Sequence, residues 1–344
     1  MARIAGIRRP PLLAMVVAAS VASACGGSAT TTDSAGSRSR TGETNVSQGG
    51  VHGAPPRPVT FVFRPLYQLP APVKDPAYAV LGRGRFALLG GLDSSEVSSA
   101  TIDVADATGV QHTAILPLAQ HDAQGADLGG QVYVFGGGSS TELDHIVGFD
   151  PARGAVSTVG ALPRAQSDVA VTAAGGTAFV VGGYDGTNWL NTILAWRPGS
   201  PVRIAGHLPL GLRYAAASAV GGRILIIGGS KPDGASDAIY RFDPASGHVR
   251  QIGRLPQAVT HASAATLGAF VYLVGGRGND LGSQTASVWS IDPRTGAVAV
   301  AGRLPEPLSD TASLSIGGAI VVAGGLTPTS TVAGVGELVP RHAP

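Results

Sequence analysis

The amino-acid sequence predicts an all-β protein made of six repeated units, each with four short antiparallel strands. Glycine accounts for 50 of the 344 residues and charged residues for only 13%. This composition suits many short strands joined by tight turns. Two sequence markers, an apolar run that ends in a glycine pair and a Leu-Pro pair, each recur six times at spacings of 46 to 49 residues. A fixed period of this kind indicates a repeat architecture.

The markers divide the chain into equivalent units. The glycine pairs begin at Gly90, Gly136, Gly182, Gly228, Gly275 and Gly324, and the Leu-Pro pairs at Leu69, Leu116, Leu162, Leu208, Leu255 and Leu304. A third marker, Asp-Pro-x-x-Gly, begins at Asp150, Asp243 and Asp292. In the fourth unit, apolar runs at 215–220, 224–228, 238–243 and 248–253 predict four strands. Four strands in a period near 47 residues are typical of a β-propeller blade, so residues 59–344 predict a single six-bladed propeller.

The two ends of this region predict how the ring closes. After the last glycine pair the sequence holds one further strand-like run, at 331–338, which leaves the sixth unit one strand short. Residues 59–68 precede the first Leu-Pro pair as a fourth strand does in the other units. We therefore expect this N-terminal strand to complete the last blade, because pairing across the seam leaves no free sheet edge.

The first 58 residues predict a targeting segment and a tether. Residues 1–24 hold three arginines followed by a 13-residue apolar run, which is shorter than the roughly 20 residues of a membrane-spanning helix and typical of a secretory signal peptide. The end of this segment, Ala22 to Cys25, resembles a bacterial lipobox, and Cys25 is the only cysteine in the chain. Residues 25–58 are rich in Ser, Thr, Gly and Pro and predict a disordered tether. We expect a secreted protein that is lipid-anchored through Cys25 on the extracytoplasmic face of the cell envelope.

One of the repeats carries a family resemblance. The segment from Gly182 to Asn188, Gly-Gly-Tyr-Asp-Gly-Thr-Asn, resembles the kelch repeat, which has about 50 residues and a glycine pair at the end of its second strand. The resemblance extends over about residues 59–340 and implies a six-bladed kelch-like propeller. Kelch repeats usually carry a tryptophan in the fourth strand, whereas the predicted fourth strands here have none. The resemblance therefore implies the fold and says little about function.

Strand alternation sorts the connections onto two faces. The turns between strands 1 and 2 and between strands 3 and 4 are short and alike, so we expect them to form a structural face. The loops between strands 2 and 3 and between blades differ from one another, as binding loops do, and share the opposite face. On that face, the residue six positions beyond each Leu-Pro leucine begins the innermost strand. This position reads Asp75, Asp122, Asp168, Tyr214, His261 and Asp310, and the residue before it reads Lys74, His121, Ser167, Arg213, Thr260 and Ser309.

The repeated aspartates have two interpretations. A residue that recurs in every unit usually has a structural task, here the capping of the interblade turn. The alternative is a ring of carboxylates that holds a cation such as Ca²⁺, although one carboxylate per blade is widely spaced for a coordination shell of about 2.3–2.6 Å. The sequence predicts no other cofactor and no metal site.

The positions that break the pattern are the candidate functional residues, because local exceptions often mark functional sites. Arg and Tyr can hold carboxylates or hydroxyls, and His can transfer protons, although ordinary variation on an exposed rim would look the same. Tyr184 and Trp189, in the loop between strands 2 and 3 of the third unit, could stack on a sugar ring, or Trp189 could cover the underside of its loop. The candidate binding residues are Lys74, His121, Asp122, Asp168, Tyr184, Trp189, Arg213, Tyr214, His261 and Asp310, and the candidate catalytic residues are His121, Arg213 and His261.

The sequence favours a binding module over an enzyme. Without its three N-terminal arginines the chain has 21 basic and 22 acidic residues, and no basic stripe predicts nucleic-acid binding. Hydrolase, zinc-protease and nucleotide-binding motifs are absent from the sequence. We expect the variable loops to bind a glycan or a protein partner. The alternative is a carbohydrate-active enzyme similar to the sialic-acid mutarotase, a sugar epimerase-type propeller, with histidine as general acid and base at the channel mouth. The copper chemistry of galactose oxidase needs a cysteine in the propeller, and Cys25 lies outside it.

Overall fold

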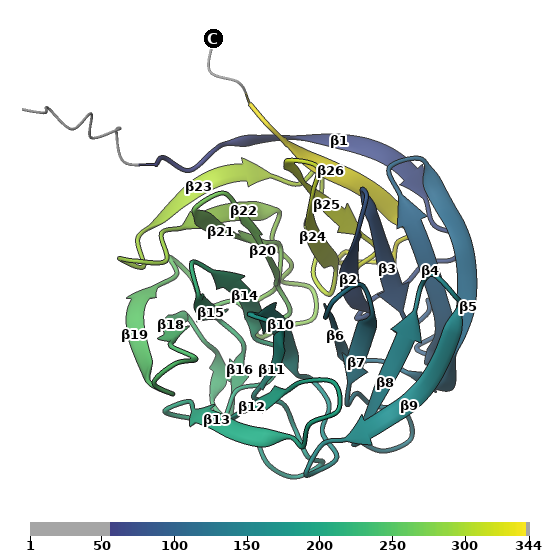
Figure 1. Ribbon diagram of the computed structural model, residues 1–344. Coiled ribbons are helices and arrows are strands. Elements are labelled where there is room, and N and C mark those ends of the chain that lie inside the picture. The colour runs from purple at the N-terminus through teal and green to yellow at the C-terminus, as the bar shows by residue number, and fades with distance from the viewer. Residues whose placement is uncertain (1–55, 342–344) are drawn as a thin grey trace, which may run out of the picture. The chain divides into compact units, whose positions relative to one another are not determined.

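The computed structural model describes residues 56–341 and shows six four-stranded blades arranged in a ring (Figure 1). The predicted signal peptide, Cys25 and the predicted tether as far as residue 55 lie outside the described residues. Residues 56–341 contain no helix, and so no helix long and apolar enough to cross a membrane. The six-bladed all-β prediction is confirmed for this part of the chain.

Each blade runs from an inner strand at the channel to an outer strand at the rim (Figure 1). Blade 1 holds β2 (Ala77–Gly82), β3 (Arg85–Leu89), β4 (Ser99–Asp106) and β5 (Gly109–Gln120), and blade 2 holds β6 (Gln124–Asp127), β7 (Val132–Phe135), β8 (His145–Asp150) and β9 (Ala155–Ala161). Blade 3 holds β10 (Ala170–Ala174), β11 (Thr177–Val181), β12 (Thr192–Trp196) and β13 (Arg203–His207), and blade 4 holds β14 (Ala216–Val220), β15 (Arg223–Ile227), β18 (Ala238–Phe242) and β19 (Val249–Arg254). Blade 5 holds β20 (Ser263–Leu267), β21 (Phe270–Val274), β22 (Ser287–Ile291) and β23 (Val298–Arg303), and blade 6 holds β24 (Ala312–Ile316), β25 (Ala319–Ala323), β26 (Gly334–Pro340) and β1 (Phe61–Gln68).

The strands of blade 4 lie within one residue of the sequence-based boundaries, but its second connection contains an extra element. A hairpin of β16 (Ser230–Lys231) and β17 (Gly234–Ala235) forms between β15 and β18. The two strands are joined by Pro232 and Asp233, and Gly234 follows. Pro-Asp-Gly is a turn signal, but it does not recur in the other repeats, so the repeat pattern did not predict this hairpin.

The ring closes through the N-terminal strand, as expected. Strand β1 pairs antiparallel with β26, from Phe61 opposite Pro340 to Gln68 opposite Gly334. Phe61 is 2% exposed and packs edge-to-face against Tyr272 of the neighbouring blade, with ring centroids 4.9 Å apart. The first described strand therefore supplies both the missing fourth strand of blade 6 and part of its contact with blade 5.

The hydrophobic core lies between the blades. The second strands are buried along almost their whole length, for example Thr177–Val181 in β11 and Phe270–Val274 in β21. Both faces of these strands are covered by neighbouring blades, which explains why their sequences are apolar at nearly every position. Residues of adjacent blades share each cluster, as Phe179 and Phe242 do with ring centroids 5.7 Å apart.

The recurring glycine pair has a steric cause. Gly275, at the end of β21, has a φ of +62°, and a Cβ atom there would lie 2.1 Å from the carbonyl oxygen of Leu308. Leu308 belongs to the connection that enters the next blade, so the backbones of two blades meet at this point. Only glycine combines this conformation with so close an approach.

The loops between strands 2 and 3 and the interblade connections share one face, which we call the loop face. Directly after the glycine pair, Ser230 bridges to Arg213 and Arg277 bridges to Thr260, and equivalent bridges occur in the other blades. Each bridge joins a loop between strands 2 and 3 to the residue before the innermost strand. This arrangement confirms the predicted sorting of the loops and brings the candidate residues to one side of the ring.

Candidate functional site

Six residues, one from each blade, form what we call the channel ring at the loop-face end of the channel. All six have positive φ angles: 49° for Asp75, 54° for Asp122, 58° for Asp168, 51° for Tyr214, 56° for His261 and 58° for Asp310. Aspartate and histidine tolerate this left-handed conformation better than most residues. The repeated aspartate therefore has a conformational reason in addition to the capping role that the sequence suggested.

Backbone hydrogen bonds tie the channel ring together. In each bond the backbone N–H of one ring residue donates to the carbonyl oxygen of the ring residue in the preceding blade. The donor–acceptor distance is 2.9 Å for Asp75–Asp310, Asp168–Asp122, Tyr214–Asp168 and Asp310–His261, and 3.3 Å for His261–Tyr214, with the donor named first. In these five pairs the backbones of neighbouring ring residues are therefore in direct contact. Among residues 56–341, no group of three or more His, Cys, Asp or Glu side chains is arranged to hold a metal ion.

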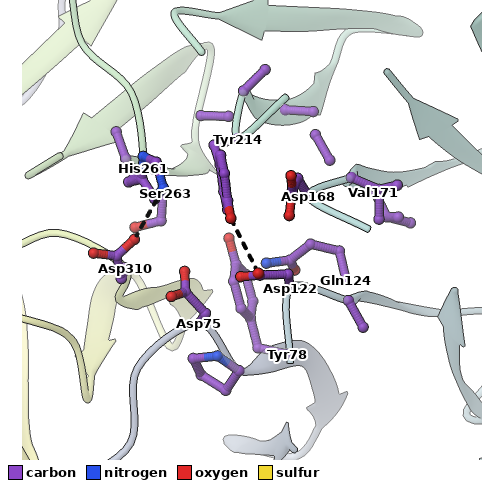
Figure 2. A pocket seen from close by; sticks show the side chains of 18 of the residues that line it. Asp75, Tyr78, Asp122, Gln124, Asp168, Val171, Tyr214, His261, Ser263 and Asp310 are labelled. Carbon is purple, nitrogen blue, oxygen red and sulfur yellow. Dashed lines mark hydrogen bonds and ion pairs between the residues drawn. The ribbon is translucent and has the colours of Figure 1, made fainter. Parts of the chain in front are cut away.

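The four aspartates of the channel ring form two hydrogen-bonded pairs. Burial, followed by the negative charge of Asp310, raises the pKa of Asp75 well above its usual range. Burial and the charge of Asp168 do the same to the pKa of Asp122. The raised pKa favours the protonated forms of Asp75 and Asp122, which can donate a hydrogen bond to Asp310 and Asp168 respectively. The four aspartates line a cavity of about 60 Å³. Figure 2 shows their carboxyl groups with the Tyr214 hydroxyl between them.

Arg213 connects the channel ring to the aromatic pair on the loop face. Its guanidinium forms an ion pair with the buried carboxylate of Asp168. The guanidinium carbon lies 4.3 Å from the ring centroid of Tyr184 and 5.5 Å from that of Trp189. Tyr184 and Trp189 meet edge-to-face at 5.4 Å. The predicted sugar-stacking pair is therefore adjacent to Arg213, which occupies one face of Tyr184.

Tyr214 and His261 form a wall between the cavity of the channel ring and a second cavity, because both residues line both cavities. Their rings stack with centroids 3.7 Å apart, and the Tyr214 hydroxyl donates a hydrogen bond of 3.1 Å to Asp122 Oδ2. Burial raises the pKa of Tyr214, so its hydroxyl remains a donor. Burial, followed by the charge of Arg277, lowers the pKa of His261 well below its usual value, so its imidazole is neutral at neutral pH.

A second cavity, the blade 4–5 pocket, opens on the other side of this wall. It has a volume of about 350 Å³, and its lining includes Trp189, Arg213, Lys231, Thr260, His261 and Arg277. Three of its lining side chains are cationic and none is acidic. Asp168 pairs with Arg213 and Asp233 with Lys231, whereas no carboxylate within residues 56–341 lies within ion-pair distance of Arg277. The pocket therefore has an excess of positive charge.

The remaining candidates lie across the channel ring from this pocket. Lys74 is 7% exposed and donates to Glu96 Oε1 at 2.5 Å. His121 lies 2.9 Å from Ser98 Oγ through Nδ1 and 3.6 Å from Asp122 Oδ2 through Nε2. The structure thus brings Arg213, Tyr214 and His261 into one pocket and places Lys74 and His121 in separate contacts on blades 1 and 2.

Ser230, Lys231 and Arg277 line the pocket but were not predicted from the sequence as site residues. A signal for Arg277 is present in the repeat, because the residue directly after each glycine pair is the one that bridges to the residue before the innermost strand of the same blade. This position reads Leu92, Gly138, Tyr184, Ser230, Arg277 and Leu326, and Arg277 is its only charged member. Lys231 reaches the pocket through the β16–β17 hairpin, which the repeat pattern does not contain.

Comparisons with known proteins agree with this architecture. The model of the Kelch motif matches residues 211–256, which span blade 4. A solved structure described as "Structure of YjhT" is similar to this chain with a TM-score of 0.68 and 18% sequence identity, over 78% of this chain and 95% of that one. At this identity the likeness shows the fold alone. A comparison with curated proteins finds no match.

Proposed function

We propose that this six-bladed kelch-type propeller is a binding module whose blade 4–5 pocket takes a small anionic group, with an acidic sugar of a glycan as the ligand class. The observation that carries the proposal is Arg277, a cation in a pocket without acidic lining residues and without a carboxylate partner in the described chain. A guanidinium pairs with a carboxylate through two parallel hydrogen bonds. A ligand carboxylate would therefore supply the charge that the pocket lacks.

The other lining groups suit a hydroxylated ring. Ser230 and Asn279 offer a hydroxyl and an amide group, and Trp189 offers apolar surface. The volume of about 350 Å³ is at the lower end of the range of about 300–1,000 Å³ that is usual for small-molecule sites. The competing ligand is an acidic segment of a protein partner, which would have to insert a loop into this pocket.

Matched acidic and neutral sugars test the proposal. Calorimetric titration of the full chain with D-glucuronate and N-acetylneuraminate is expected to show binding, and D-glucose and the methyl ester of N-acetylneuraminate are expected to bind at least tenfold more weakly. The Arg277→Gln variant should lose at least tenfold in affinity for both acids. Arg294→Gln is the control, because Arg294 lies in a turn of the opposite face and pairs with Asp292. Equal binding of acids and neutral sugars, or an unchanged Arg277→Gln variant, would refute the proposal, and binding of acidic peptides alone would favour a protein partner.

An enzyme of the sialic-acid mutarotase type is the second candidate. Tyr214 contacts Asp122, whose carboxyl group has a raised pKa, and His261, whose imidazole has a lowered pKa. Two neighbouring groups with pKa values shifted in opposite directions are typical of acid–base sites. Both ring nitrogens of His261, however, already lie within hydrogen-bond distance of Thr260 and Arg277, which favours the binding role. Exchange NMR of N-acetylneuraminate anomers separates the two: accelerated exchange that is lost in His261→Asn supports the enzyme, and no acceleration supports the binding module.

We also propose that the propeller is held at the extracytoplasmic face of the cell envelope by lipid on Cys25. The support is the sequence of residues 1–58 alone. When the full chain is expressed in a bacterial host, mass spectrometry of its N-terminal peptide should show a diacylglyceryl-modified Cys25, and Cys25→Ser should shift the protein from the detergent phase to the aqueous phase. An unmodified Cys25, or a retained residue 1–24 segment, would refute the anchor.

A further inference from the structure

We infer that Ser230 is held as a hydrogen-bond donor at the blade 4–5 pocket by a one-way chain of hydrogen bonds that begins at Arg277 and passes through His261 and Thr260. This inference rests on the proposed function and adds a selectivity to it. At the Ser230 position the pocket favours a ligand oxygen that only accepts hydrogen bonds, as a carboxylate oxygen does, over a group that must donate, such as an amide N–H.

The first step fixes the tautomer of His261. Nη2 of Arg277 lies 3.1 Å from Nε2 of His261. An arginine side chain has donors and no acceptor, so Nε2 must be the nitrogen without a proton. A neutral imidazole carries one proton, which therefore resides on Nδ1 of His261.

The second step fixes the hydroxyl of Thr260. Nδ1 of His261 lies 3.0 Å from Thr260 Oγ1, and with its proton assigned it must be the donor of this hydrogen bond. Oγ1 of Thr260 also lies 2.8 Å from Ser230 Oγ. Thr260 is 2% exposed, so solvent does not compete for its hydroxyl hydrogen, and the hydrogen is directed to Ser230.

The third step places the last hydrogen at the pocket. Ser230 Oγ accepts from Thr260, and no acceptor for its own hydrogen occurs among residues 56–341. The backbone of Ser230 is fixed by two hydrogen bonds with Arg213, of 2.7 and 3.0 Å, and the residue lines the pocket. A ligand oxygen in the pocket is therefore the remaining partner for this hydroxyl.

The groups around His261 fix the direction of the hydrogen bonds that run from Arg277 to Ser230. Burial and the positive charges of Arg277, Arg213 and Lys74 lower the pKa of the imidazole, which prevents a second proton on Nε2. Tyr214 covers one face of the ring, and the nearest carboxylate oxygen, Asp310 Oδ1, lies 3.9 Å from Nε2, beyond hydrogen-bond distance. Within residues 56–341, therefore, no carboxylate oxygen lies close enough to accept a proton from Nε2 of His261.

The tautomer can be measured without a ligand. Long-range ¹⁵N–¹H correlation NMR of the full chain, with the signal assigned by its loss in His261→Asn, is expected to show the Nδ1–H form of His261 at pH 7. The Nε2–H form or a doubly protonated ring would overturn the inference, whatever the pocket binds.

The selectivity is tested with D-glucuronate and D-glucuronamide. The first carries a carboxylate, which only accepts hydrogen bonds, and the second carries an amide in its place, which also donates them. The ratio of their affinities should fall at least threefold in Thr260→Val, which interrupts the chain, and should be retained in Thr260→Ser. Thr266→Val is the control, because Thr266 and Ser218 form the same kind of hydroxyl pair, at 2.8 Å, between blades 4 and 5 at the other end of the channel. If glucuronate binds and Thr260→Val keeps the ratio, this inference fails alone. If neither sugar binds the unmodified chain, the proposed function fails and the selectivity fails with it.

Discussion

The phenol ring of Tyr214 lies on the imidazole of His261, with ring centroids 3.7 Å apart and an angle of 24° between the ring planes. The two residues come from adjacent blades and occupy equivalent positions of the repeat, with φ angles of 51° and 56°. They are the two members of the channel ring that are not aspartate. Their stack separates the acidic cavity of the channel ring from the cationic blade 4–5 pocket, so one pair of side chains divides two sites of opposite character.

The hydroxyl of Tyr214 supports the channel ring through Asp122. Tyr214→Phe keeps the stack and leaves Asp122 Oδ2 without this donor, so we expect the free energy of unfolding to fall by about 1–3 kcal/mol. The pKa of Asp122 should rise further, because the hydrogen bond from Tyr214 holds it down. Chemical denaturation and ¹³C NMR of the carboxyl group measure the two effects. Tyr184→Phe, which removes an exposed hydrogen bond to Gly186, should change stability by less than about 0.5 kcal/mol. A Tyr214→Phe variant as stable as the unmodified chain would contradict the role of this hydrogen bond.

The protonated carboxyl of Asp75 makes stability depend on pH. Its pKa is raised in the folded state, so above about pH 4, where the unfolded chain loses this proton, the folded state binds more protons and stability falls as pH rises. Asp75→Asn mimics the protonated form. We therefore expect it to match the unmodified chain near pH 4 and to be more stable at pH 8, as measured by urea denaturation.

Two features make this comparison specific. His261 acts in the opposite direction, because its lowered pKa makes stability rise with pH up to about 6.5, but it is present in both proteins and cancels in the difference. Asp292 supplies a control of opposite sign. Burial raises the pKa of Asp292, but the hydrogen bonds from Arg294 lower it overall, so we expect Asp292→Asn to be less stable than the unmodified chain at pH 8. A difference between Asp75→Asn and the unmodified chain that does not vary with pH would show that Asp75 is ionised in the folded state.

Closure of the ring depends on the buried side of β1. Phe61→Ala removes a side chain packed against Tyr272, and we expect it to lower the free energy of unfolding by about 3–5 kcal/mol. Val62 is the next residue on the same strand and is 44% exposed, so Val62→Ala should change it by no more than about 0.5 kcal/mol. Denaturant unfolding of the two variants decides the point, and equal effects would mean that side-chain packing at the seam adds nothing beyond strand pairing.

The glycine pair can be tested within a single blade. Gly275 and Gly268 have nearly the same φ, +62° and +61°, but a Cβ atom on Gly275 would meet Leu308 O at 2.1 Å, whereas one on Gly268 would meet no atom within 4 Å. Gly268→Ala should therefore cost about 1–2 kcal/mol, the strain of the left-handed conformation alone. Gly275→Ala should cost at least about 3 kcal/mol or prevent folding. Thermal unfolding of both proteins measures the difference, and similar midpoints would show that the approach of Leu308 is unimportant.

The candidate site was only partly accessible from the sequence. Arg213, Tyr214 and His261 were found because they interrupt a repeated pattern, and the structure brings these three into one pocket. His121 and Lys74 interrupt the same pattern but lie in separate contacts, because a repeat position does not say which neighbour a side chain reaches. The lining residues that were missed include Ser230 and Lys231 in the unpredicted hairpin, and Arg277 at a repeat position whose importance follows only from the bridges between loops.

The sequence by itself determined the architecture: six blades of four strands, the strand boundaries of blade 4 to within one residue, the loop face, and closure by the N-terminal strand. These features follow from periodicity and turn chemistry, which are local properties repeated every 46 to 49 residues. The tertiary structure decided which side chains of different blades meet. The pairing of Arg213 with Asp168, the lack of a carboxylate partner for Arg277 within residues 56–341, the raised pKa of Asp75 and the lowered pKa of His261 all depend on burial and on neighbours from other repeats. No local pattern in the sequence records them.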